Sequence, residues 1–156
     1  VSLLIDSFLE SNLKNKTLNI VGDHDFFNSD SLTQKEIDSY IENSKGSIRF
    51  FGFEKDLSKF YSNGAVYISA SKREGMPFSV LEALDSGLNC ILSKVPGHKE
   101  FKNFSNVSFF SGKDELKKLL SKDFYKSSHD DTNDNLLKYK KEAVKKSIKK
   151  IYKELL

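Results

Sequence analysis

Apolar residues recur along this chain with two spacings, and each spacing predicts one kind of element. Short β-branched and aromatic runs predict strands at 17–22, 47–52, 65–69, 89–93 and 107–110. Apolar residues three or four positions apart predict helices at 1–13, 33–44, 55–63, 79–87 and 114–121. Strands that alternate with helices are typical of α/β proteins built around a doubly wound parallel sheet.

Two of these helices begin with a possible capping box. Thr33 is followed three residues later by Glu36, and Ser79 is followed by Glu82 at the same distance. In such a box the hydroxyl and the carboxylate each accept a backbone N–H of the first turn. We therefore expect Thr33 and Ser79 to cap their helices, and Gly87 to end the second one.

The last part of the chain has a different pattern. Residues 122–133 are polar and predict a loop, and 134–156 predict one long helix. Residues 138–156 contain eight lysines and two glutamates, while one face of the helix carries Leu137, Val144, Ile148, Ile151 and Leu155. This basic amphipathic helix either packs on the domain, which we favour, or lies on an anionic membrane surface. A net charge of only +3 disfavours nucleic acid as a partner.

Composition predicts one domain over 1–156, with an α/β core at 1–121. The 156 residues are 38% hydrophobic and include 13 Phe and 6 Tyr, enough for a substantial core. The one cysteine, Cys90, lies in an apolar strand and is expected in that core. Neither zinc-ligand spacing nor a run of eighteen apolar residues occurs, so we expect a cytoplasmic protein, membrane-peripheral at most.

The segment EGMPFSVLEA, residues 74–83, carries the chemistry. Glu74 follows a predicted buried strand, where ligands of open α/β sheets bind, and Glu82 lies one turn into the next helix. Two carboxylates at different depths could accept hydrogen bonds from a hexose and a ribose, with a pyrophosphate between them at the helix N-terminus. That arrangement fits a nucleotide sugar. The competing interpretation is a solvated Glu74 and a Glu82 that only closes the capping box.

Residues 71–100, SKREGMPFSVLEALDSGLNCILSKVPGHKE, resemble the signature region of retaining glycosyltransferases with the GT-B fold, the family-4-like "glycosyl transferases group 1". The resemblance implies that the chain is the C-terminal, nucleotide-sugar-binding domain. It implies Glu74 as the catalytic residue in contact with the donor sugar and Glu82 at the ribose. It implies further donor contacts from the helix-start loop Gly75, Met76, Pro77, Phe78, Ser79 and Val80 and from the base loop Phe51, Gly52 and Phe53.

The resemblance also implies parts that this sequence does not show. The family domain opens with a central strand and a loop whose arginine and lysine clamp the pyrophosphate, whereas the chain begins inside the following helix. We therefore expect a strand position between 17–22 and 65–69 that is either unfilled or filled by a strand from another segment. The N-terminal acceptor-binding domain is likewise expected on another segment or chain, and the chain alone is expected to be inactive.

The function implied is transfer of a sugar, with retention, from a nucleotide sugar to a saccharide or lipid-linked acceptor, in polysaccharide biosynthesis. A UDP-sugar is the expected donor, as substrate, with no cofactor and no metal. Two alternatives stay open: a non-catalytic nucleotide-sugar-binding or regulatory module of this fold, and a sugar-nucleotide epimerase.

Overall fold

The computed structural model describes residues 1–11, 13–22, 31–121, 136 and 139. Eleven elements follow one another in this part of the chain. They are α1 (Ser2–Glu10), β1 (Leu18–Ile20), α2 (Gln34–Asn43), β2 (Ile48–Phe50), α3 (Ser58–Asn63), β3 (Val66–Ser69), α4 (Phe78–Asp85), β4 (Asn89–Ser93), the 3₁₀ helix η1 (Pro96–Phe101), β5 (Val107–Phe110) and α5 (Lys113–Leu120). Each predicted strand and helix up to residue 121 is confirmed in type.

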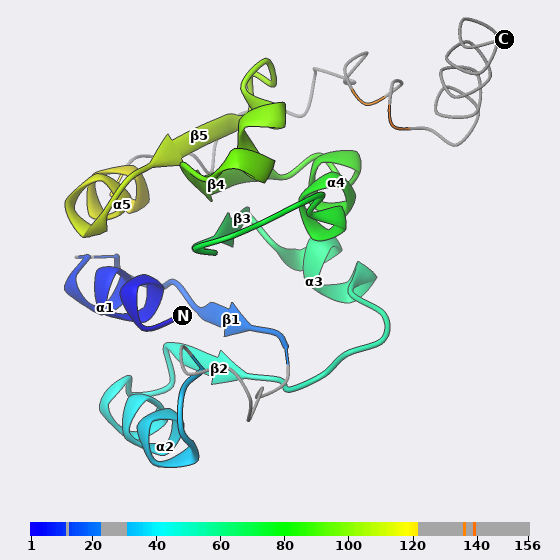
Figure 1. Cartoon of the computed structure of the whole chain (residues 1–156). Coiled ribbons are helices and arrows are strands. Elements are labelled where there is room, and N and C mark those ends of the chain that lie inside the picture. Colours follow the sequence, from blue (N-terminus) through cyan, green and yellow to red (C-terminus); the bar gives the residue numbers. More distant parts are fainter. Residues whose placement is uncertain (12, 23–30, 122–135, 137–138, 140–156) are drawn as a thin grey trace, which may run out of the picture.

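The five strands form two parallel sheets. β1 pairs with β2, with Leu18 opposite Ile48, and β4 pairs with both β3 and β5. Within the described residues no backbone pairing joins β1 to β3, so the strands are divided into a pair and a triplet. Figure 1 shows β1 and β2 on one side of this division and β3, β4 and β5 on the other. The predicted doubly wound parallel architecture is confirmed, and the division lies between the two strands where the sequence predicted it.

Two apolar clusters cover the opposite faces of the strands. The first joins α1, α5 and strands of both sheets, and its buried members include Ile5, Leu18, Ile48, Ile91 and Phe110. The second lies under α3, α4 and η1 and includes Tyr61, Val80, Leu84, Cys90, Leu92 and Phe101. Because the first cluster draws side chains from both sheets, it holds them together where backbone hydrogen bonds do not.

Helices α1 and α5 lie side by side over the first cluster (Figure 1). At their exposed rim Glu10 accepts hydrogen bonds from Lys113 and Lys117, with Nζ to Oε distances of 2.5 and 3.0 Å. These ion pairs are open to water, so the apolar contact beneath them contributes most of the attachment.

The predicted helix ends are confirmed in two cases out of three. The Thr33 hydroxyl accepts the Glu36 N–H at 3.3 Å while the Glu36 carboxylate accepts the Thr33 N–H at 2.7 Å. Gly87, at φ 77°, ends α4, and Leu88 N–H donates back to the Ala83 carbonyl. The capping box predicted for Ser79 and Glu82 is wrong, because the N-cap of α4 is Pro77, two residues before Ser79.

The predicted loop at 122–133 and helix at 134–156 lie outside the described residues, apart from Leu136 and Tyr139. Both of these pack against the second cluster. Among the described residues, no helix has the length and apolar character needed to cross a membrane.

Candidate functional site

The loop that carries Glu74 leaves the carboxyl end of β3 and leads directly into α4. Glu74 is half-buried, Gly75 and Met76 are exposed, and Pro77 is buried at the end of the loop. The loop lies at the carboxyl ends of the strands of the triplet, which is where ligands bind in open α/β sheets. Its first residues are attached to β4, because the Ser93 hydroxyl donates a hydrogen bond of 2.6 Å to the Ser71 carbonyl.

Gly97, in η1, supports the same loop from behind. A methyl group on its Cα would collide with the carbonyl oxygens of Glu74 and Gly75. The two backbone segments therefore approach each other closely only because residue 97 has no side chain. This contact fixes the backbone at Glu74.

His98 follows Gly97 and is completely buried. Its Nδ1 donates to the Ser93 carbonyl at 2.8 Å, which ties η1 to the end of β4. The segment after Val95 forms the 3₁₀ helix η1 and not a regular α-helix. His98 thus acts here as a core residue that holds Gly97 against the glutamate loop.

The first turn of α4 has no side-chain cap among the described residues. Pro77 occupies the N-cap position and has no side-chain acceptor for the free N–H groups, and the Ser79 hydroxyl is hydrogen-bonded to the Tyr67 hydroxyl at 2.8 Å. The Val80 N–H donates to the Pro77 carbonyl, and the Val80 side chain is fully buried. The backbone N–H groups of Phe78 and Ser79 thus stand at a helix N-terminus, where anions bind favourably.

Glu82 is exposed on α4, and its carboxylate does not cap the helix. Its Oε2 accepts a hydrogen bond of 3.0 Å from the hydroxyl of Tyr61, which comes from α3. This contact replaces the predicted capping box, because the hydroxyl of Ser79 bonds Tyr67 and the carboxylate of Glu82 bonds Tyr61. Glu82 remains available to a ligand from the solvent side.

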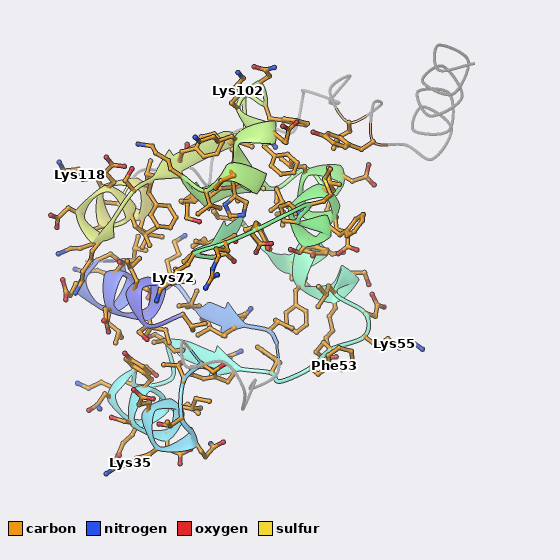
Figure 2. The ribbon with its side chains drawn as sticks, viewed as in Figure 1. Lys35, Phe53, Lys55, Lys72, Lys102 and Lys118 are labelled. Carbon is orange, nitrogen blue, oxygen red and sulfur yellow. The ribbon has the colours of Figure 1, made fainter. Side chains whose placement is uncertain are left out.

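The predicted base loop belongs to the other sheet. Phe51, Gly52 and Phe53 follow β2, and the Phe53 side chain is 74% exposed. In Figure 2 Phe53 lies on the connection between β2 and α3, with α3 between it and α4. The Phe51 ring meets the Phe60 ring of α3 edge-on, with centroids 4.8 Å apart. Helix α3 therefore separates the base loop from α4 and contacts both.

Three residues of this region were not predicted from the sequence: Tyr61, Tyr67 and Gly97. Tyr61 lies 21 positions before Glu82, and no local pattern connects the two. Lys72 and Arg73, which the sequence analysis did not assign to the site, are exposed in the glutamate loop. Among the described residues no group of three His, Cys, Asp or Glu side chains could hold a metal ion.

Comparison with known proteins decides the family. A family model described as "Glycosyl transferases group 1" matches residues 1–118. The chain belongs to this family. No curated protein sequence matches.

Solved structures give the same fold for this group 1 glycosyl transferase domain. Anabaena HepE in complex with UDP is 22% identical, with a TM-score of 0.66, over 76% of this chain and 34% of its own. HepE in complex with UDP-glucose gives a TM-score of 0.63 at 21% identity, over 76% of this chain and 34% of its own. The pneumococcal O-GlcNAc transferase GtfA, in complex with UDP and GlcNAc, gives a TM-score of 0.59 at 22% identity over 98% of this chain and 31% of its own.

The group 1 glycosyl transferase chain thus spans about a third of the length of the solved structures it matches. At these identities the likeness establishes the fold. The match of the family model to residues 1–118 includes both glutamates, the α4 start and the base loop.

Proposed function

We propose that this chain is the donor-binding half of a glycosyltransferase that moves a hexosyl group from a UDP-sugar to a saccharide or lipid-linked acceptor with retention. The observation that carries the proposal is the β3 to α4 junction. It combines a half-buried Glu74, an α4 start without a side-chain cap, and an exposed Glu82 one turn further along. The UDP and UDP-glucose complexes of HepE, a protein of the same fold, support the choice of donor.

Each part of a nucleotide sugar has a proposed partner. Glu74 accepts hydrogen bonds from the donor sugar, and Glu82 accepts those of the ribose hydroxyls. Backbone N–H groups of the 75–80 loop, with Phe78 and Ser79 foremost, bind the pyrophosphate at the N-terminus of α4. The base lies against Phe51, Gly52 and Phe53. We propose that no metal ion is needed, because the helix dipole, worth about half a positive charge at this end of α4, would act together with an arginine and a lysine from outside this chain to balance the phosphate charge.

The division between β1 and β3 supports a further part of the proposal. Two facing strand edges without partners are unfavourable inside a domain, because backbone N–H and C=O groups need hydrogen bonds. We propose that one additional parallel strand fills this position and brings an arginine and a lysine to the pyrophosphate. An acceptor-binding domain would complete the cleft. The polypeptide that supplies both can be part of the same protein or another chain.

The setting of the enzyme follows from the proposed acceptor. A cytoplasmic transferase that uses a lipid-linked acceptor would benefit from contact with an anionic membrane surface. The eight lysines at 138–156 supply the charge for such a contact, at about 1 kcal/mol for each lysine near the surface.

Turnover measurements test the function. The full-length protein, incubated with UDP-sugars and a saccharide acceptor, should release UDP at roughly 1 to 100 turnovers per second. Residues 1–156 alone should release none, because the proposed acceptor-binding domain lies outside them. UDP binding without turnover in the full-length protein would favour a regulatory module. Turnover by residues 1–156 at the full rate would contradict the proposed division of labour.

A further inference from the structure

Tyr61 lies beside the proposed site and bonds one of its glutamates, although it does not belong to the site as predicted. Its ring is buried in the second apolar cluster with 9% of the residue exposed. The Tyr67 ring lies beside it, with centroids 6.4 Å apart. The hydroxyl leaves this apolar packing and meets Glu82 Oε2 at 3.0 Å. A rigid, buried ring thus presents a fixed hydrogen-bond donor to an exposed carboxylate.

The single phenolic proton of Tyr61 has two acceptors within reach. Glu82 Oε2 lies at 3.0 Å and the Ser79 carbonyl oxygen at 3.4 Å. A carboxylate accepts hydrogen bonds more strongly than a neutral carbonyl, so the proton points to Glu82. Burial, and next the hydrogen bond to Glu82, raise the pKa of Tyr61, so its hydroxyl stays protonated and remains a donor at neutral pH.

The carboxylate of Glu82 keeps room for a ligand. Its two oxygens offer about four acceptor positions, and Tyr61 occupies one of them. Among the described residues only Tyr61 donates a hydrogen bond to the Glu82 carboxylate. Two ribose hydroxyls can therefore bind Glu82 without displacing Tyr61.

Helix α3 also reaches the other proposed part of the nucleotide site. Phe60, next to Tyr61, packs its ring edge-on against Phe51 in the base loop. Neighbouring residues of one helix thus contact the loop proposed for the base and the carboxylate proposed for the ribose. The base and the ribose are adjacent parts of a nucleoside, and a single helix sets the positions of their partners.

We propose that Tyr61 is a positioning residue that fixes the Glu82 carboxylate for the ribose hydroxyls before the nucleotide binds, and thereby makes the site select ribonucleotides over 2′-deoxyribonucleotides. The inference rests on the proposed function, because it takes the Glu82 ligand to be a ribose. A carboxylate held in one orientation loses less conformational entropy when it binds. The benefit grows with the number of hydroxyls that bind Glu82, so a nucleotide without the 2′-hydroxyl, which makes one of the two hydrogen bonds, gains less from it.

The test compares Tyr61→Phe with Tyr67→Phe in the full-length protein. Both substitutions remove one hydroxyl from neighbouring rings, but the Tyr67 hydroxyl bonds Ser79 and does not contact Glu82. Titration calorimetry with UDP and with 2′-deoxy-UDP gives the ratio of their affinities. Tyr61→Phe should weaken UDP binding about fivefold, leave 2′-deoxy-UDP binding within about twofold, and lower the ratio accordingly. Tyr67→Phe should leave the ratio unchanged.

A double-substitution cycle sharpens the result. If Tyr61 acts through Glu82, adding Tyr61→Phe to Glu82→Gln should weaken UDP binding no further. Equal losses of UDP and 2′-deoxy-UDP affinity in Tyr61→Phe, or equal ratios in both tyrosine variants, would overturn the inference and leave the proposed function intact. A wild-type protein that does not bind UDP would overturn both.

Discussion

The two sheets of this domain are stabilised in different ways. The triplet β3, β4 and β5 is hydrogen-bonded throughout and has apolar clusters on both faces. The pair β1 and β2 is attached to it by the first apolar cluster without backbone pairing between the two sheets in the described residues. Both glutamates lie between β3 and β4 of the triplet, whereas the base loop follows β2 of the pair. A nucleotide bound as proposed would therefore contact both sheets, and its affinity would depend on how firmly the pair is held.

The largest expected effect concerns local opening of the triplet, which the reactivity of the Cys90 thiol in β4 measures. Burial raises the pKa of this thiol to about 12, from an ordinary value of 9.0. At pH 8 Ellman's reagent should therefore label Cys90 at least about a thousandfold more slowly in the native protein than in denaturant, given typical domain stabilities. Rapid labelling of the native protein would show that the triplet opens locally.

The same raised pKa gives a pH dependence of stability. The buried thiol stays protonated, whereas the unfolded chain ionises near the ordinary pKa of 9.0. The contribution of the protonated Cys90 thiol to the free energy of unfolding is therefore fully present below pH 9 and is lost as the pH rises from there toward 12. Cys90→Ala should show a weaker decline in unfolding free energy over this range than the wild type.

Next in size is the attachment of the pair to the triplet. Ile5 of α1 is completely buried in the first cluster. Ile5→Ala should lower the free energy of unfolding by about 2 to 5 kcal/mol, measured by urea denaturation. Leu3→Ala is the matched control on the same helix, because Leu3 is 39% exposed, and its effect should be much smaller.

Labelling of Cys90 in the Ile5→Ala variant then shows whether the two sheets unfold together. If they do, labelling should accelerate by the factor that corresponds to the loss of stability. Unchanged labelling in a destabilised protein would mean that the pair unfolds by itself and that the shared cluster is not what unites the domain.

Gly97→Ala tests the support of the glutamate loop within the triplet. The added methyl group would collide with the Glu74 and Gly75 carbonyls and should cost about 1 to 3 kcal/mol of unfolding free energy. Turnover should fall more than UDP affinity, because Glu74, the displaced residue, is the one proposed to contact the sugar. Gly112→Ser is the control, since a Cβ there meets nothing within 4 Å and serine suits a helix N-cap. Normal turnover in Gly97→Ala would refute the positioning role.

The smallest effect is expected at the exposed rim between α1 and α5. Hydrogen bonds from Lys113 and Lys117 lower the pKa of Glu10. The stability they add is present above the ordinary pKa of 4.5 and is lost as the pH falls below it. Because the pairs are exposed, Glu10→Gln at pH 7 should leave the urea midpoint almost unchanged. A clear decrease in the urea midpoint would show that the ion pairs of Glu10 contribute to the attachment of α1.

Local patterns sufficed to predict most of the fold. The strands at 89–93 and 107–110 and the capping box of Thr33 follow from residues a few positions apart, and the structure has them as expected. The division between β1 and β3 followed from the family resemblance and not from the local pattern. The local sequence pattern placed Glu74 on a loop and Glu82 on a helix, but it could not show which side chains contact them.

The capping box at Ser79 failed for a physical reason. Local reasoning pairs Ser79 with Glu82, but tyrosines from β3 and α3 compete for both side chains, and the fold brings those tyrosines close. Hydrogen bonds between residues 12 and 21 positions apart depend on packing, which a sequence window does not contain. The close approach of Gly97 to Glu74 is missed for the same reason.

The central claim is that Glu82 binds the ribose and Glu74 the donor sugar. The most direct test is titration calorimetry in the full-length protein, with UDP and a UDP-sugar as ligands and with Glu82→Gln and Glu74→Gln as variants. Hydrogen bonds to a charged group contribute about 1.5 to 3 kcal/mol each, so Glu82→Gln should weaken UDP binding at least about tenfold with folding nearly unchanged. Glu74→Gln should keep UDP affinity and lose turnover or donor selectivity. Equal UDP affinity in the wild type and Glu82→Gln would contradict the account, because Glu82 would then not hold the ribose.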